Sequence, residues 1–412
     1  MNPLRIAFFT NYYYPVVNGV VRSVASFREI LTEQGHIVFV FAQADSEYKD
    51  EEPFIFRYPS LSLPLQMDIA AVIPVSSFVD QLLPALKLDI IHTHHPILLG
   101  QAAANKAADL NVPLVFTFHT QYWEYTHYIP FPQEVIQEFL RNAIHSWLKV
   151  FMQKCQHIVI PSESIKEILI REYGLEDRYT VIPTGTDLKP FLQADGKAVR
   201  QSQGWQDDKV IMSIGRLAPE KNWETLFRAV AQVYAQYPNM RLVLIGDGPQ
   251  KQALEELAAE LGIAGRITFT GQLSFEKIPA YLKAADIFSF ASVTETQGLV
   301  TIEAMAAGLP VVAVDGSGTH DIVDHGKEGL LVENNPNALA SAINEMLCNP
   351  QQMQQFSANA LQKAKTFDIH RLGKQMIIVY EQAIQDKKDN RYVTLKETQK
   401  NDRSYEQGLI DR

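Results

Sequence analysis

The chain has 412 residues, more than one hydrophobic core usually supports, so two domains of about 200 residues each are expected. Hydrophobic residues make up 46% of the sequence and aromatic residues 10%, which excludes a disordered chain. The net charge of -10 argues against nucleic acid as the main partner, and two cysteines without metal-ligand spacing exclude a disulfide framework and a zinc site.

In the first half of the chain, short apolar runs alternate with segments of helical periodicity. Residues 4–10 are predicted to form a buried strand, and residues 19–34 an amphipathic helix that Gly35 ends. Later strand-like runs and one helical segment continue the alternation, at 36–41, 89–93, 97–110 (helical), 113–118 and 157–160. This alternation predicts a parallel sheet with helices on both faces.

A turn rich in Pro and Gly at 182–187 marks the predicted domain boundary. The same alternation then repeats, with strands predicted at 209–214, 241–245, 266–270, 286–290 and 310–314. The sequence therefore predicts two doubly wound α/β domains, residues 1–185 and 186–366. The segment 386–412 is charged and poor in apolar residues, which predicts a disordered tail.

Loops that follow strands are candidate sites, because ligands of open α/β sheets bind outside the carboxyl ends of the strands. Gly19 begins a predicted helix and would let the backbone approach a phosphate, although turn chemistry explains it equally well. In the second domain, Gly215 precedes two cations, Arg216 and Lys221. They can point at one diphosphate, or they can be solvated surface residues.

Two glutamates, Glu295 and Glu303, flank a predicted helix start at Gln297 and Gly298. Helical side chains lean toward the helix N-terminus, so the Glu303 carboxylate is expected near Glu295 and both can reach one ligand. Free backbone N–H groups at such a helix start suit a phosphate, and carboxylates suit sugar hydroxyls. The alternative is an ordinary strand, loop and helix with solvated glutamates.

The segment 292–314 resembles the signature of retaining glycosyltransferases of family 4, in which Glu, seven residues and Glu precede Ala-Met-Ala-x-Gly-x-Pro-Val. The linker at 183–187 matches the family's Pro-x-Gly-x-Asp, and 215–221 matches its Gly-Arg-x-x-x-x-Lys, with Asn222 where a glycine is usual. The resemblance implies the GT-B fold, with two Rossmann-like domains facing across a cleft. It also implies that helices at 367–385 cross back onto the N-terminal acceptor domain, leaving 186–366 as the donor domain.

The resemblance also implies roles for individual residues. It places Arg216 and Lys221 at the diphosphate of a UDP-sugar, Glu295 at the sugar hydroxyls and Glu303 at the ribose. His119 would lie beside the donor sugar, although a lone histidine is more often structural. The remaining donor-binding residues implied are Gly19, Gly215, Gly246, Gln297, Gly298 and Leu299.

The implied reaction needs no cofactor and no metal ion, and the family is thought to use front-face attack assisted by the leaving phosphate. His92, His94 and His95 also cluster in the sequence, and a metal site is the alternative to a substrate role for them. No Asp or Cys is spaced with these histidines, which argues against a metal.

The run 121–130 is similar to the Tyr-x-x-Tyr-x-His-Tyr-Ile run of bacterial diacylglycerol glucosyltransferases. This similarity implies a lipid acceptor such as 1,2-diacylglycerol, glucose from UDP-glucose as the group transferred, and acceptor-side roles for Tyr122, Tyr125, His127 and Tyr128. A saccharide or polyprenyl-linked acceptor, and a nucleotide-sugar-binding module without turnover, are the alternatives.

A lipid acceptor implies peripheral contact with the inner face of a membrane, from a cytoplasm in which two cysteines stay reduced. The segment 141–154 combines Arg141 and Lys149 with an apolar face that includes Trp147 and Phe151. It is predicted to be either an interfacial helix or a helix packed on the core. The proline-broken segment 61–73 is the second candidate for membrane contact. No apolar stretch long enough to span a membrane is expected.

Overall fold

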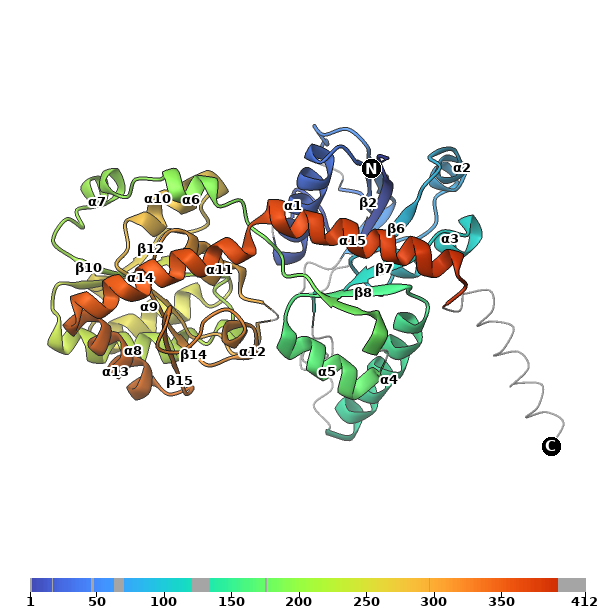
Figure 1. The fold of residues 1–412 in the computed structure, drawn as a ribbon. Helices are drawn as coiled ribbons and strands as arrows, with labels where there is room; N and C mark the ends of the chain where they lie inside the picture. The colour runs from blue at the N-terminus through green and yellow to red at the C-terminus, as the bar shows by residue number, and fades with distance from the viewer. Residues whose placement is uncertain are drawn as a thin grey trace. The chain divides into compact units, whose positions relative to one another are not determined.

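The computed structural model describes residues 2–16, 18–45, 48–62, 70–120, 134–174, 176–295 and 297–391. The chain divides into two compact units, which Figure 1 colours by residue number. Unit 1 contains Met1–Pro183 together with the chain from Leu372 onward, and unit 2 contains Thr184–Arg371. The chain therefore passes between the units twice. Each unit is built on a parallel sheet, so the predicted α/β class with two doubly wound sheets is confirmed.

Unit 1 has a seven-stranded sheet in which every recorded pairing is parallel. Its central strands are mostly apolar and are buried except at Arg5, as expected of strands covered on both faces. The strands, in spatial order, are β3 (Ile55–Tyr58), β2 (Ile37–Gln43), β1 (Arg5–Thr10), β6 (Ile90–Thr93), β7 (Leu114–Thr117), β8 (His157–Ile160) and β9 (Tyr179–Val181). A separate antiparallel pair joins β4 (Ser60–Ser62) to β5 (Ala70–Val72).

Helices cover this sheet, and several begin at a side-chain cap. The Oδ1 atom of Asn18 accepts from the Val21 N–H at 2.9 Å, and the hydroxyls of Ser76 and Ser162 accept in the same way. The helices are α1 (Gly19–Glu33), α2 (Ser77–Ala85), α3 (Leu99–Leu110), α4 (Glu134–Gln153), α5 (Glu163–Tyr173) and α15 (Ile369–Lys388). The first three residues of α15 belong to unit 2, and the rest of the helix belongs to unit 1.

The C-terminal helix α15 packs on unit 1 (Figure 1). The Tyr380 hydroxyl is buried and lies 2.7 Å from Nδ1 of His92 in β6. A Cβ atom on Gly373 would lie 3.0 Å from the Ile30 side chain, so glycine lets α15 approach α1 closely. The helix continues to Lys388, with Asp386 buried, so the prediction that a disordered tail begins at residue 386 is wrong at its first residues. Residues 392–412 of that tail lie outside the described residues.

Unit 2 has a six-stranded sheet, again with only parallel pairings recorded. Its strands, in spatial order, are β12 (Ile267–Phe269), β11 (Met240–Ile245), β10 (Lys209–Ile214), β13 (Ile287–Phe290), β14 (Val311–Val314) and β15 (Gly329–Val332). The helices are α6 (Lys189–Gln193), α7 (Lys197–Gln203), α8 (Trp223–Gln236), α9 (Lys251–Glu260), α10 (Ile278–Lys283), α11 (Leu299–Ala306), α12 (Ser317–His320), α13 (Pro336–Cys348) and α14 (Pro350–Ala364).

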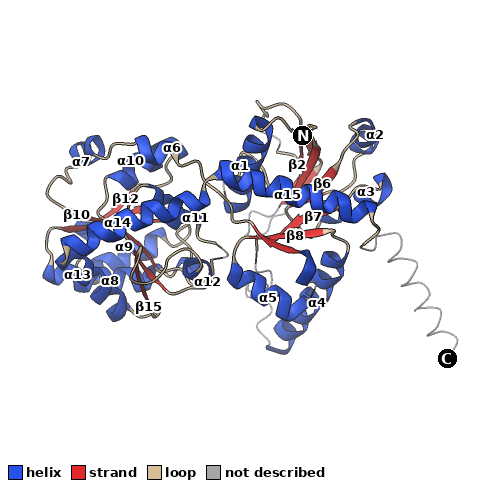
Figure 2. Ribbon diagram, in the orientation of Figure 1, coloured by secondary structure: helices blue, strands red, loops and turns tan. Residues whose placement is uncertain are grey.

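Helices flank the strands of unit 2 on both faces (Figure 2). Two clusters of buried hydrophobic side chains lie between the sheet and these helices. Successive residues of a strand point to opposite faces. In β10, Met212 belongs to the cluster that contains α11 residues, and its neighbour Ile211 to the cluster that contains α8 and α13 residues.

Both sheets contain a point at which the strand order reverses, and ligands of doubly wound sheets bind outside the carboxyl ends of the strands at that point. In unit 1 this point lies between β1 and β6, so Asn11 and His94 flank it. In unit 2 it lies between β10 and β13, so the loops 215–222 and 291–298 flank it.

The structure decides the alternatives for residues 141–154. Phe151 is fully buried and meets Phe116 of β7 edge-to-face at 5.3 Å, and Leu148 is buried in the same core. The apolar face of α4 beyond residue 140 therefore packs on the sheet, while Arg141 and Lys149 are exposed. The interfacial interpretation of this helix is therefore wrong. The sequence could not exclude it, because a helix that packs on a core and a helix that lies on a membrane have the same kind of apolar stripe. Among the described helices, none combines the length and hydropathy that crossing a bilayer requires.

Candidate active site

Lys221 and Glu295 form an ion pair at the reversal point of the unit 2 sheet. Lys221 ends a short 3₁₀ turn after β10, η3 (Pro219–Lys221), and Glu295 lies in the loop after β13. Their side chains are 20% and 17% exposed. The Ser292 hydroxyl donates to the Glu295 carboxylate at 2.7 Å, and the Lys221 ammonium lies 5.8 Å from the centre of the Phe290 ring. The pair is thus fixed by its surroundings yet open to a ligand.

Arg216 is exposed in the same loop as Lys221, and within the described parts of the chain it makes no ion pair. Its backbone is held, because its carbonyl accepts from the Trp223 indole N–H at 3.0 Å. The structure therefore brings the predicted cations Arg216 and Lys221 into one loop at the reversal point.

Gly246 has a structural role in the turn after β11. The sequence alone could not distinguish this role from binding of a ligand. Its φ is 143°, and a Cβ atom there would lie 2.0 Å from the carbonyl oxygen of Gly215. Only glycine therefore allows the turn after β11 to pack against the loop after β10. The Leu217 N–H then donates to the Asp247 carbonyl at 2.9 Å and fixes the two loops together.

Asn222 occupies the position where the family has a glycine, and it adopts the left-handed conformation with φ 53°. Asparagine tolerates this conformation better than most residues. Its Nδ2 donates to the Ala291 carbonyl at 3.0 Å and to Asn334 Oδ1 at 2.8 Å. The substitution therefore keeps the backbone geometry at the start of α8 and ties the loop after β10 to the loop after β13.

The side chain of Gln297 is committed to the chain's own backbone. Its Oε1 accepts from the Thr184 N–H at 2.7 Å, and its Nε2 donates to the Thr184 carbonyl at 2.8 Å. Both residues are buried. The Gln297 side chain therefore fixes the loop before α11 to Thr184, and the donor-binding role of Gln297 stays a prediction.

The two predicted glutamates differ in exposure. Glu295 is partly exposed, whereas Glu303 is only 1% exposed on α11. Gly298, with φ 77°, precedes α11, and the half-buried Leu299 is its first residue. Gly298 thus supplies the sharp turn that starts the helix, and a ligand would meet Glu295 and the helix start before it reached Glu303.

In unit 1, four histidines gather at the carboxyl ends of β6 and β7. Nδ1 of His94 lies 3.0 Å from Nε2 of His119, and the ring of His94 stacks on that of His92 with centroids 4.4 Å apart. His92 also lies 2.6 Å from the Thr117 hydroxyl through Nε2, and His95 accepts from the Asn11 N–H at 3.1 Å. The predicted residue His119 is therefore one end of a connected cluster.

Burial sets the protonation of this cluster. It lowers the pKa of His92, His95 and His119 to about 3, and it lowers the pKa of His94 well below its ordinary value. All four rings are neutral near pH 7. Within the described ranges, no group of His, Cys, Asp and Glu side chains is arranged to hold a metal ion.

Other predicted residues have simpler outcomes. Gly19 is exposed at the first position of α1, where Asn18 caps the helix. Tyr122, Tyr125, His127 and Tyr128 lie outside the described residues, so their acceptor-side roles stay predictions.

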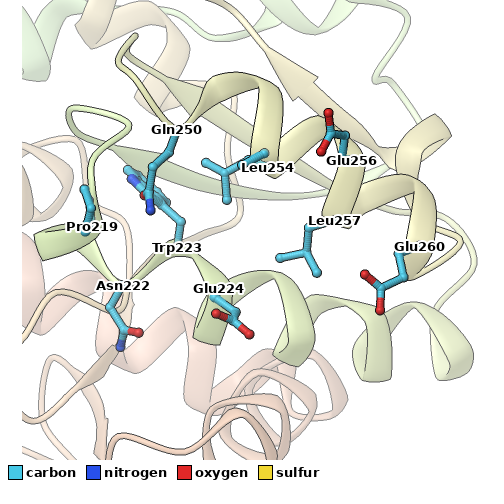
Figure 3. A pocket seen from close by; sticks show the side chains of 10 residues that line it. Pro219, Asn222, Trp223, Glu224, Gln250, Leu254, Glu256, Leu257 and Glu260 are labelled. Carbon is cyan, nitrogen blue, oxygen red and sulfur yellow. The ribbon is translucent and has the colours of Figure 1, made fainter.

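A hollow of about 500 Å³ lies beside η3, between α8 and α9 (Figure 3). Carboxylates of Glu224, Glu256 and Glu260 line it, together with Leu254 and Leu257. Lys221 and Glu295 are not part of its lining. Three carboxylates would repel a diphosphate, so this hollow does not suit the diphosphate of a sugar nucleotide.

Two sequence families match the chain. Residues 17–190 match the family described as Glycosyltransferase Family 4, and residues 195–363 match the family described as Glycosyl transferases group 1. The alpha-monoglucosyldiacylglycerol synthase of Acholeplasma laidlawii is 31% identical over 370 residues, which cover 87% of this chain and 92% of that protein. The synthase of the same name from Streptococcus pneumoniae is 33% identical over 317 residues, covering 75% of this chain and 71% of that protein.

A solved structure of sucrose-phosphate synthase from Thermosynechococcus elongatus superposes with a TM-score of 0.77. It is 26% identical, and the match covers 92% of this chain and 98% of that chain.

Proposed function

Because the chain belongs to the family 4, group 1 glycosyltransferases, which have the GT-B fold, we propose that it moves glucose from UDP-glucose to 1,2-diacylglycerol with retention of configuration. Glucose and diacylglycerol are proposed because two relatives are named alpha-monoglucosyldiacylglycerol synthase. The sugar of UDP-glucose is α-linked, so an α-glucoside product requires retention.

The ion pair of Lys221 and Glu295 is the observation that supports a sugar-nucleotide site. Departure of a nucleoside diphosphate leaves negative charge, which fixed cations at the site stabilise. Lys221, Arg216 and the backbone N–H groups at the start of α11 supply that positive potential. A bound diphosphate would compete with Glu295 for the Lys221 ammonium, which frees the carboxylate to accept hydrogen bonds from sugar hydroxyls.

His119 has a different role in this proposal. A neutral imidazole can donate or accept a hydrogen bond, but it brings no positive charge to the leaving group. We therefore assign His119 to a hydrogen bond with the donor sugar. The proton of the acceptor hydroxyl passes to a phosphate oxygen of the leaving UDP, as in front-face attack.

A diacylglycerol acceptor lies in a bilayer, so unit 1 would contact the membrane surface from the cytoplasm. With α4 excluded, the exposed apolar side chains Phe54, Val75 and Phe78 are the candidates, at 51%, 67% and 63% exposure. Val75 and Phe78 follow the predicted segment 61–73 in the sequence, and Phe54 precedes it; residues 63–69 of that segment lie outside the described ranges. An exposed free thiol, Cys348, also fits a reducing cytoplasm.

The saccharide acceptor is the second candidate, favoured by the similarity to a sucrose-phosphate synthase. Incubation of the purified protein with labelled UDP-glucose, UDP-galactose or GDP-mannose separates the candidates. Each donor is tested with detergent-dispersed diacylglycerol, with soluble saccharides and with no acceptor. Label in a lipid product only with UDP-glucose and diacylglycerol supports the proposal. Label in a soluble saccharide supports the second candidate, and binding of donor without any product supports a module without turnover.

A further inference from the structure

We propose that His94 donates the hydrogen bond to His119 and thereby holds His119 in the tautomer that carries its proton on Nδ1. His94 would then be a positioning residue, because it acts on the reaction only through His119. The tautomer follows from the hydrogen bonds of the cluster, whereas its catalytic consequence rests on the proposed function.

The geometry leaves the His94 ring little freedom. It lies between His92, on which it stacks with an interplanar angle of 29°, and His119, whose ring is inclined to it by 23°. The Phe8 ring meets it edge-to-face at 5.0 Å. His92 is itself held at both nitrogens, by the hydroxyls of Tyr380 and Thr117. The 3.0 Å contact between Nδ1 of His94 and Nε2 of His119 is therefore a fixed feature of unit 1.

Proton counting selects the direction of this hydrogen bond. Both rings are neutral because burial lowers the pKa of each, so each ring has one N–H. If His119 donated from Nε2, then Nδ1 of His94 would be the acceptor and the single proton of His94 would lie on its Nε2. That Nε2 is buried and has no hydrogen-bond partner in the described part of the chain.

A buried N–H without a partner is rarer in proteins than a buried acceptor without one. The arrangement in which His94 carries its proton on Nδ1 avoids the unpartnered N–H. His119 must then accept through Nε2 and carry its own proton on Nδ1.

The consequence concerns what His119 offers to a ligand. His119 is half-buried, and its Nδ1 has no hydrogen-bond partner among the residues that the structure describes. In the selected tautomer this nitrogen is a donor, so it would recognise an oxygen lone pair, such as that of a sugar hydroxyl. In the other tautomer it would be an acceptor and would bind only a hydroxyl that donates.

Two variants of His94 separate a tautomer effect from a packing effect. The amide nitrogen of asparagine can take the place of the imidazole Nδ1, so His94→Asn keeps a donor to His119. His94→Leu fills the site without any donor. The tautomer of His119 is read from ¹⁵N–¹H spectra of the histidine side chains, with the signals of His119 assigned through His119→Asn.

We expect a protonated Nδ1 and an unprotonated Nε2 for His119 in the wild type and in His94→Asn, and a mixture of tautomers in His94→Leu. Turnover with UDP-glucose and diacylglycerol should fall at least about tenfold in His94→Leu, mainly in kcat, with most of the loss recovered in His94→Asn. A wild-type His119 protonated on Nε2 would overturn the proposal, as would equal losses of kcat in two folded variants.

The spectra of the wild type and of His94→Asn decide the tautomer even where His94→Leu does not fold. They also need no turnover. A wild type without transferase activity would therefore contradict the proposed function and leave the tautomer measured.

Discussion

The ammonium of Lys221 is bound to the carboxylate of Glu295, although the two residues are 74 positions apart in the chain. The strand order of the unit 2 sheet explains the contact. The chain leaves β10 and returns in β13, which pairs with β10, so the loops after the two strands meet at the reversal point. The family resemblance implied that the two residues hold different parts of a ligand, and the structure adds that they form an ion pair with each other.

Removing either member of this pair should lower turnover strongly. Lys221→Ala and Glu295→Gln are each expected to reduce kcat/KM by at least about 100-fold, because each removes a charged contact to the donor. The double variant should lose less than the product of the two single losses, because the two residues interact. Steady-state kinetics measure this coupling. Strictly multiplicative losses would show that the pair does not act as a unit.

The matched control is the exposed pair of Arg228 and Glu224 on α8. Glu224→Gln removes a carboxylate from an ion pair near the same loop, where solvent weakens the interaction. Turnover and the free energy of unfolding should both stay near the wild-type values. A loss of turnover comparable with that of Glu295→Gln would contradict the assignment of Glu295 to the site, because removal of any carboxylate near this loop would then lower turnover.

Asn222 offers a test of backbone conformation. Asn222→Gly should keep most of the turnover, because glycine adopts φ 53° without strain. Asn222→Ala should lower the free energy of unfolding by about 1–3 kcal/mol, since alanine is strained in this conformation and the bonds to Ala291 and Asn334 are lost. Urea unfolding of both variants measures the difference. Equal stabilities would contradict the role of the left-handed conformation.

The buried histidines predict that the fold loses stability in acid. In the unfolded chain each has a pKa of about 6.5. Burial lowers the pKa of His92, His95 and His119 to about 3 in the folded protein. Between these values the unfolded chain binds more protons than the folded chain. The free energy of unfolding should therefore fall as the pH drops from about 6.5, by up to about 1.4 kcal/mol per pH unit for each histidine.

Urea unfolding at several pH values between 7 and about 4.5 measures this slope. His95→Asn supplies the control, because the asparagine oxygen can accept from the Asn11 N–H as the histidine does, without titrating. Its slope should be shallower than that of the wild type. A protein that became more stable in acid would contradict the neutral state of the cluster.

Membrane contact should depend on Val75 and Phe78. Changing both to serine removes two exposed apolar side chains, and each contributes about 1.5–3 kcal/mol when it is fully buried. Even partial burial in the lipid therefore predicts at least about tenfold weaker binding to vesicles in co-sedimentation.

The double variant Arg141→Glu with Lys149→Glu, on α4, is the control and should bind vesicles nearly as the wild type does. The reverse pattern would return the membrane surface to α4. Phe151→Ser should lower the free energy of unfolding by several kcal/mol instead, because its ring lies in the core.

The parts of this molecule that could be predicted are those with strong local patterns. Apolar runs such as residues 209–214 predicted β10 with the bounds that the structure has. The strands β3 and β15 were missed, because Arg57 interrupts the apolar run of β3 and β15 begins with Gly329, a residue type that is depleted in strands.

Contacts between distant residues could not be predicted in the same way. The bond from Asn222 to Asn334 and the bonds from Gln297 to Thr184 join residues more than 100 positions apart, and no local pattern encodes them. His94 was visible only as one of several clustered histidines. Its pairing with His119 depends on the order of β6 and β7 in the sheet.

The most direct test of the account is the configuration of the product. Purified protein, UDP-glucose and detergent-dispersed diacylglycerol should give a glucosyl-diacylglycerol whose anomeric proton shows the small coupling constant of an α-glucoside in NMR spectra. Lys221→Ala, assayed in parallel, should give at most about 1% of that product. A β-linked product would contradict retention, and glucose transferred only to a soluble saccharide would contradict the lipid acceptor.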